Sequence, residues 1–185
     1  MERDTGLPKR PNYFFALLPD RAAMASADRM AKALHGLLGL SDAPRGSRKY
    51  HVSLWGWPAG HAPDTEELAL MHRAAQRVEQ APFRLVFDEV ATFGQGLEKP
   101  ALVVTGDDGV IGADRLRDAI EQGMRAGGFR GRRSAGRRHL TLLYDRFRTK
   151  PFRVRPLSWR VSEFVLIRSV RKQPYDILGR WPLQS

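Results

Sequence analysis

Apolar residues recur along the chain with the spacings that distinguish helices from strands. Intervals of three and four residues predict amphipathic helices at 20–39, 64–80 and 114–125. Shorter alternating or continuously apolar segments predict strands at 13–18, 49–55, 83–87, 101–105, 138–144, 159–170 and 177–183, of which we expect the last two to pair. The resulting order, β-α-β-α-β-β-α-β-β-β, is typical of an α+β fold with a mostly antiparallel sheet.

The chain has 185 residues, without a low-complexity tract or a dividing linker, so we expect residues 1–185 to form a single domain. It contains no cysteine, which excludes a disulfide scaffold, a Cys-ligated zinc module and a thiol nucleophile. The longest apolar run, 13–18, is much shorter than the roughly 20 residues of a membrane helix. We therefore expect a cytoplasmic protein with no membrane partner and no obligate protein partner.

Positive charge is concentrated in one part of the chain. The net charge is +11, and residues 125–171 carry thirteen Arg and one Lys against two acidic residues, a net of +12. The remaining residues therefore sum to −1. The excess of Arg over Lys is equally compatible with codon bias, but the clustering favours an anionic ligand, of which nucleic acid is the usual one.

Two segments share the pattern His-x-hydroxyl-Leu: His51-Val52-Ser53-Leu54 and His139-Leu140-Thr141-Leu142. In a strand, residues two apart point to the same face, so each segment presents an imidazole beside a hydroxyl. One such segment is usually structural. Two copies in a chain with only five histidines indicate a site, whereas His35, His61 and His72 lie in predicted helices or a turn and are expected to be structural.

Two histidines facing one pocket can act as general base and general acid. The two hydroxyls can donate hydrogen bonds to the oxygens of a phosphodiester, with one imidazole on each side of phosphorus. This chemistry needs no metal and no cofactor, and the chain has neither a Gly-x-Ser-x-Gly elbow nor a Walker loop.

These motifs resemble those of the 2H phosphoesterase superfamily, and within it the RNA 2′,3′-cyclic phosphodiesterases, also called 2′-5′ RNA ligases. The resemblance extends to the aromatic opening strand at 12–19 and to the closing segment at 164–169, Tyr175 and 181–183. It implies a bilobed α+β fold: two pseudo-symmetric halves of antiparallel sheet, helices packed outside and a central cleft.

The resemblance also implies roles for the motif residues. His51 would donate a proton to the leaving ribose oxygen, and His139 would activate water. Ser53 and Thr141 would hold the phosphate oxygens. The substrate would be RNA ending in a 2′,3′-cyclic phosphate, the product a 2′-phosphate, and the reverse 2′-5′ ligation would also be open to the enzyme.

The sequence departs from the family pattern at positions that concern the substrate. Ser53 replaces the usual Thr, Trp55-Gly56-Trp57 follows the first motif, Arg138 replaces a common Pro, and Tyr144 stands where a basic residue is frequent. Strict alternation places Trp55 on the face of His51, where it would stack on a base unless it packs in the core, and places Tyr144 on the opposite face unless a bulge intervenes. Candidate phosphate ligands are Arg132, Arg133, Arg137 and Arg138, of which Arg137 shares the face of His139.

Two alternatives remain open at this point. The same chemistry fits a small cyclic nucleotide or an ADP-ribose cyclic phosphate, which would need no extended basic surface. A non-catalytic RNA-binding module would bind RNA in a salt-dependent manner without using the histidines.

Overall fold

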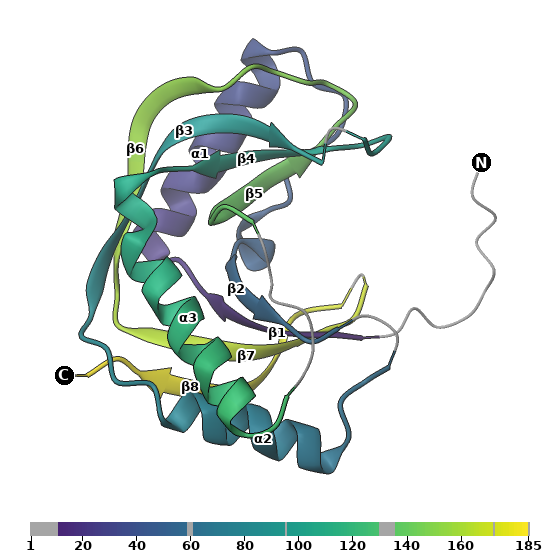
Figure 1. Cartoon of the computed structure of the whole chain (residues 1–185). Coiled ribbons are helices and arrows are strands. Elements are labelled where there is room, and N and C mark those ends of the chain that lie inside the picture. Colours follow the sequence, from purple (N-terminus) through teal and green to yellow (C-terminus); the bar gives the residue numbers. More distant parts are fainter. Residues whose placement is uncertain (1–10, 59–60, 95, 130–135, 172, 185) are drawn as a thin grey trace.

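A computed structural model describes residues 11–58, 61–94, 96–129, 136–171 and 173–184. Eight strands form one open sheet in the order β6-β3-β4-β5-β2-β1-β7-β8, with antiparallel neighbours throughout (Figure 1). The strands are β1 (Asn12–Leu17), β2 (Val52–Gly56), β3 (Phe83–Phe93), β4 (Ala101–Thr105), β5 (His139–Tyr144), β6 (Phe152–Val161), β7 (Glu163–Ser169) and β8 (Asp176–Pro182).

The three predicted helices are present with shifted ends. They are α1 (Arg21–Leu37), α2 (Thr65–Gln76) and α3 (Ile111–Ala126). The first begins where the Asp20 side chain accepts a hydrogen bond from the Ala23 amide at 2.7 Å, and the second begins with a capping box. The third starts earlier than predicted because it continues directly from the short 3-10 turn η2 (Asp108–Val110). No helix in the described ranges is long and apolar enough to cross a membrane.

The sheet consists of two four-stranded halves that meet at the two motif strands. One half is β2-β1-β7-β8 and the other is β5-β4-β3-β6, both given from the centre outward. By position in the sheet, β2 therefore corresponds to β5, β1 to β4, β7 to β3 and β8 to β6. The halves are joined by pairing of Val52 with Leu140, the middle residues of the two motifs. The predicted bilobed α+β architecture of pseudo-symmetric antiparallel halves is confirmed.

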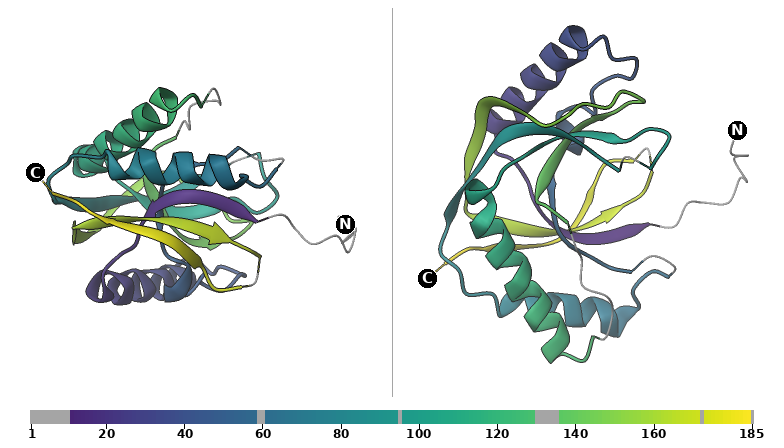
Figure 2. Two further views of the ribbon diagram at one scale, coloured as in Figure 1. Left: turned by 90° about the horizontal axis from the view of Figure 1, so that it is seen from below. Right: turned by 45° about the horizontal axis from the view of Figure 1, so that its top comes forward.

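The helices cover the sheet from both sides. Helix α1 packs against β5 and β6, α3 packs against β2 and β3, and α2 contacts α3 and β8. Figure 2 shows the strands lying between α1 on one side and the pair α2 and α3 on the other. The two motif strands are thus each in contact with a helix, β2 with α3 and β5 with α1 (Figure 1).

The predicted strand at 159–170 is wrong, because the chain changes halves within it. β6 ends at Val161 and pairs with β3, whereas β7 begins at Glu163 and pairs with β1. The only interruption between the two strands is the pair of consecutive exposed polar residues Ser162 and Glu163, and both strands contribute buried residues to the core on either side of it. β8 pairs with β7, which confirms the predicted pairing of the C-terminal segment.

Most apolar side chains form one cluster between the sheet and the helices. A second, small cluster of Ala16, Val165 and Ile167 lies on β1 and β7, with Phe14 and Tyr175 packed against it. These two aromatic rings also contact His51, at centroid distances of 5.1 and 5.4 Å. The small cluster is therefore the apolar support of the first motif's histidine.

Candidate active site

The register of the two motif strands brings their four polar residues together. Val52 and Leu140 are paired and fully buried, so the residues on either side of each point to the other face. In this antiparallel register His51 lies across from Thr141, and Ser53 lies across from His139. Both imidazoles are partly exposed. The predicted set of two histidines and two hydroxyls thus converges at the centre of the sheet.

Both imidazole rings are held in the same way. Nδ1 of His51 lies 3.0 Å from the Lys49 carbonyl oxygen, and Nδ1 of His139 lies 2.9 Å from that of Arg137. A carbonyl oxygen only accepts, so Nδ1 carries the proton in each neutral ring. Nε2 makes no hydrogen bond within the described part of the chain and is left to exchange a proton with a ligand.

Both histidines are shifted toward the neutral form. Burial lowers the pKa of His51 to about 4, with further lowering by the positive charges of Arg45, His139 and Lys49. Burial also lowers the pKa of His139, and Arg138 adds to that effect. Since the charge of His139 is among the causes that lower the pKa of His51, protonation of His139 disfavours protonation of His51. A bound anion would raise both pKa values.

Each motif strand has a β-bulge at the leucine that follows the hydroxyl residue. Ser53 and Trp55 oppose consecutive residues of β1, and Thr141 and Leu143 oppose consecutive residues of β4, so Leu54 and Leu142 are the extra residues. The bulge turns the next residue of each strand inward.

Trp55 is the clearest consequence of the first bulge. It is 1% exposed and packs against Phe15, Trp57 and Phe129. This corrects the prediction that it shares the face of His51 and contacts substrate. Strict alternation failed here because it cannot register an extra residue.

The second bulge has the opposite consequence for Tyr144, which comes to the face of His139 and Thr141 and is 42% exposed. The guanidinium of Arg45 lies over its ring at 5.2 Å. Burial raises the pKa of Tyr175, and the nearby positive charge of Arg45 opposes that shift. The Tyr175 hydroxyl in turn lies 2.9 Å from Nδ1 of His51. Sequence reasoning missed Arg45 because it treated 41–47 as a plain polar loop.

Arg138 supports the first bulge from inside the protein. It is 4% exposed, donates to the carbonyl oxygens of Ser53, Leu54 and Gly136, and lies 3.3 Å from a carboxylate oxygen of Asp114. The guanidinium is thus engaged with the protein itself. This corrects the prediction that Arg138 contacts a substrate phosphate.

Several arginines of the basic block 125–171 form ion pairs with acidic residues that lie outside the block. Arg137 is exposed and pairs with Glu89 and Asp107 at 3.3 and 2.8 Å. Other arginines of the block form ion pairs as well: Arg125, Arg146, Arg153 and Arg168. Arg132 and Arg133 lie outside the described residues. The charge concentration in the sequence therefore overstates the positive charge available to a ligand.

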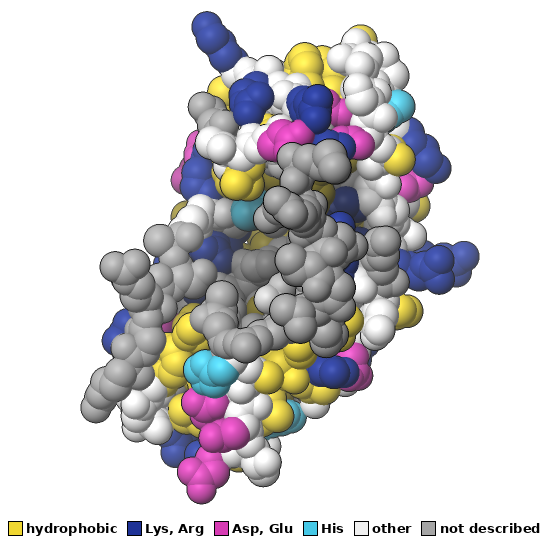
Figure 3. Space-filling model, turned by 90° about the vertical axis from the view of Figure 1, so that its right-hand side faces the viewer, with side chains coloured by type: hydrophobic (Ala, Val, Ile, Leu, Met, Phe, Trp, Pro, Cys, Tyr) yellow, Lys and Arg dark blue, Asp and Glu magenta, His cyan; other side chains and the backbone are white. Residues whose placement is uncertain are grey.

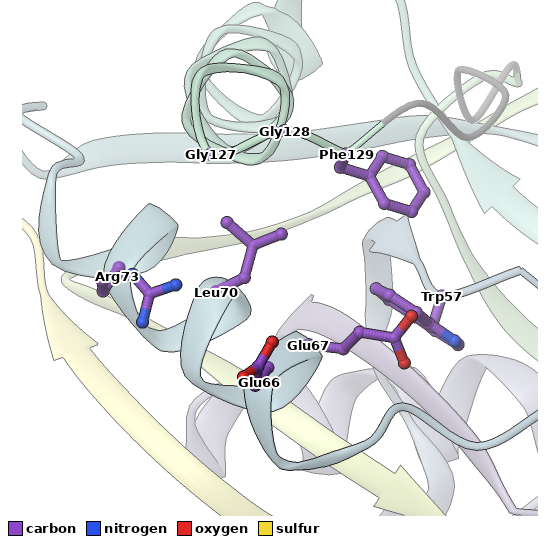
Figure 4. Close-up of a pocket in the computed structure, with 8 residues that line it drawn as sticks. All are labelled: Trp57, Glu66, Glu67, Leu70, Arg73, Gly127, Gly128 and Phe129. Carbon is purple, nitrogen blue, oxygen red and sulfur yellow. The ribbon is translucent and has the colours of Figure 1, made fainter.

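A pocket of about 440 Å³ lies beside the first motif, lined by Arg45, Gly46, Ser47, Arg48, Lys49, Gln173 and Pro174. Figure 3 shows a hollowed face of the molecule with a histidine side chain inside it and Lys and Arg side chains around it. A second pocket, of about 360 Å³, lies between α2 and the end of α3 and contains none of the motif residues (Figure 4). Its walls are partly apolar, from Trp57, Leu70 and Phe129.

Among the residues that the structure describes, no three His, Cys, Asp or Glu side chains form a group that could hold a metal ion. The polar groups that converge at the centre of the sheet are imidazoles, hydroxyls and, nearby, cations. Such a set can bind a phosphate and move protons around it.

No family model and no curated protein matches the sequence. The fold does match solved structures over nearly the whole chain. The TT0787 protein of Thermus thermophilus has a TM-score of 0.70 at 23% identity, covering 94% of this chain and 98% of its own. E. coli LigT in complex with 3′-AMP has a TM-score of 0.70 at 22% identity, covering 95% and 100%.

A further structure, described as a phosphoesterase, has a TM-score of 0.68 at 22% identity and covers 95% of this chain and 99% of its own. The chain therefore has the fold of LigT and of this phosphoesterase. The bilobed fold that the motif resemblance implied is the fold that these structures share with the chain.

Proposed function

We propose that this protein hydrolyses the 2′,3′-cyclic phosphate at an RNA 3′ end to a 2′-phosphate, using His51 and His139 without a metal ion. The observation that carries the proposal is the pair of imidazoles on adjacent strands, each with Nδ1 fixed by a carbonyl and Nε2 left free. Support also comes from the shared fold, since E. coli LigT has been crystallised with 3′-AMP and with phosphate.

In the proposed reaction, water attacks phosphorus opposite the ribose 3′ oxygen. His139 takes the proton from the attacking water, the bond from phosphorus to the 3′ oxygen breaks, and His51 gives its proton to that oxygen. Ser53 and Thr141 donate hydrogen bonds to the remaining phosphate oxygens, where negative charge develops. The same sequence, with the 5′-hydroxyl of a second RNA in place of water, forms the bond from phosphorus to that 5′ oxygen, breaks the bond to the 3′ oxygen and is the 2′-5′ ligation.

The acid role of His51 depends on the substrate. With its pKa lowered to about 4, His51 is neutral at pH 7 in the free protein. The negative charge of a bound phosphodiester favours the imidazolium form and raises that pKa. Substrate binding thus provides the proton donor that the free protein lacks.

The test is an assay in excess EDTA on a short RNA ending in a 2′,3′-cyclic phosphate, with the product identified by ³¹P NMR. We expect opening to a 2′-phosphate by the wild-type protein and no opening by His51→Ala or His139→Ala. A 3′-phosphate product would contradict the proposed bond cleavage, and loss of activity in EDTA would contradict metal independence.

Two other outcomes would replace the proposal. Opening of a nucleoside 2′,3′-cyclic phosphate or an ADP-ribose cyclic phosphate, but not of RNA, would make the small molecule the substrate. Salt-dependent RNA binding without turnover, unchanged by either histidine substitution, would make the protein an RNA-binding module.

A further inference from the structure

The pocket beside the first motif is lined by cationic side chains and by no acidic side chain. Three of its seven lining residues are Arg45, Arg48 and Lys49, and none is acidic. These three side chains form no ion pair with any described carboxylate, in contrast to Arg137. Nε of Arg45 is buried without a hydrogen-bond partner in the described structure. A buried donor that lacks a partner is costly, so the protein holds Arg45 in this position at an energetic penalty.

The cations of the pocket also repel one another. Burial lowers the pKa of Lys49, and Arg45 lowers it further. Gly46 has a φ of 81°, a left-handed conformation that favours glycine, and it begins the short turn η1 (Ser47–Lys49) that gathers these side chains. The arrangement brings like charges together, which is typical of a site whose ligand is negatively charged.

The loop that carries Arg45 is fixed to the strand of the second motif. The carbonyl oxygen of Leu142, the bulge residue, accepts a hydrogen bond from the Arg45 amide at 2.9 Å. The buried carboxylate of Asp145 accepts from the amides of Ser41 and Asp42, both at 2.8 Å. The position of the pocket is therefore set by the strand of the second motif, although its loop precedes the first motif in the chain.

The pocket is connected directly to the reacting group of the first motif. Nζ of Lys49 lies 4.4 Å from the ring centroid of Tyr175, and the carbonyl oxygen of Lys49 accepts from His51. The Tyr175 hydroxyl contacts the same ring nitrogen. An anion in the pocket would therefore lie on the Nδ1 side of the His51 ring, while Nε2 of the same ring faces the reacting phosphate.

We propose that this pocket binds a second phosphate of the substrate, the one on the 5′ oxygen of the ribose that carries the cyclic phosphate. This inference rests on the proposed function and narrows its substrate class. In RNA that 5′ phosphate is the backbone link to the preceding nucleotide, so the pocket makes the enzyme select a chain end over a nucleoside cyclic phosphate.

The test compares two mononucleotides, cytidine 2′,3′-cyclic phosphate and the same compound with a 5′-phosphate. In the wild-type protein we expect the 5′-phosphate to raise kcat/KM by about 10-fold or more, as for a charge-assisted hydrogen bond to phosphate. In Arg45→Ala and Arg48→Ala that advantage shrinks to less than about 3-fold. The control Arg73→Ala removes an exposed arginine at the other pocket and keeps the full advantage.

A binding experiment separates failure of the pocket from failure of the proposed function. Affinity is measured for cytidine 2′-phosphate with and without a 5′-phosphate, in EDTA. Opening of both cyclic compounds at equal rates, or an advantage that survives Arg45→Ala and Arg48→Ala, overturns the pocket alone. If neither compound is opened, the proposed function fails. In that case the proposed phosphate-binding pocket is supported only if the 5′-phosphate raises the affinity for cytidine 2′-phosphate and Arg48→Ala abolishes that increase in affinity.

Discussion

The two motif strands are nearly identical in geometry and differ in their electrostatic surroundings. Each has a histidine held by the carbonyl two residues earlier, a bulge after the hydroxyl residue and a phenylalanine ring about 5 Å away, Phe14 or Phe93. Only His51 is surrounded by the cations Arg45 and Lys49 and by the hydroxyl of Tyr175. The pseudo-symmetric strands position the two imidazoles in the same way. The loops before β2 and β8 make the electrostatic surroundings of the two imidazoles different.

The bulges are stabilised by different means, although they are equivalent in position. The carbonyl of Leu54 accepts from the buried side chain of Arg138, whereas the carbonyl of Leu142 accepts from the backbone of Arg45. Each half is therefore secured by a residue that precedes the motif of the other half. The two halves are joined into one site because each supplies a hydrogen-bond donor to the bulge carbonyl of the other.

The largest expected effect comes from removing either histidine. His51→Ala and His139→Ala should each lower kcat by about 10²- to 10⁴-fold, because each removes one proton transfer. Their losses should be similar in spite of the different surroundings. Unchanged circular dichroism would show that both variants fold, and a variant that retains near wild-type kcat would remove its histidine from the mechanism.

The next effect separates two neighbouring arginines. Arg138→Ala should destabilise the protein by about 3 kcal/mol, because it leaves buried carbonyls without a donor. Arg137→Ala should cost less than about 1 kcal/mol, because its ion pairs are solvent-exposed. Urea unfolding of both variants is the measurement. Equal losses would contradict the structural role given to Arg138.

Substitutions of Ser53 and Thr141 test whether the two halves contribute equally to the reaction. Ser53→Ala and Thr141→Val should each lower kcat by about 10- to 100-fold with little change in stability, since each removes one donor to the phosphate oxygens. A loss at one position only would mean that the two halves bind the phosphate unequally. Single-turnover rates with saturating enzyme measure this without interference from product release.

The pH dependence should reveal the electrostatic difference. The productive form has one imidazole protonated and the other neutral, so kcat/KM falls below the lower pKa and above the higher one. Both pKa values are lowered from 6.5 in the free protein, that of His51 to about 4, so the optimum of kcat/KM should lie below pH 6.5. The optimum of kcat should lie higher, because bound phosphate raises both values.

The smallest expected effect is a shift of the pH profile of kcat/KM in Arg45→Ala. Removing this cation should raise the pKa of His51, which moves the acidic limb of the kcat/KM profile to higher pH by about one unit or less. Arg73→Ala should leave the profile in place. A monotonic wild-type profile, or the same shift in both variants, would contradict the assigned surroundings of His51.

The sequence predicted the features that depend on periodic patterns. The three helices, the two motif strands and the convergence of His51 and His139 follow from spacing and from the repeated motif. Strict alternation gives the wrong faces for Trp55 and Tyr144, because a one-residue bulge reverses the alternation. The two conditions that the sequence analysis left open, core packing of Trp55 and a bulge before Tyr144, are the ones that the structure shows. The pocket cations were missed because Arg45 is positioned by β5, about 100 residues away in the chain.

The most direct test of the central claim is the double variant His51→Ala/His139→Ala, assayed in EDTA on RNA with a 2′,3′-cyclic phosphate end. Residues that act in one step are not additive, so the double variant should be no more than about 10-fold slower than either single variant. Losses that multiply would mean that the histidines contribute independently, and the two halves would then not form a single catalytic site.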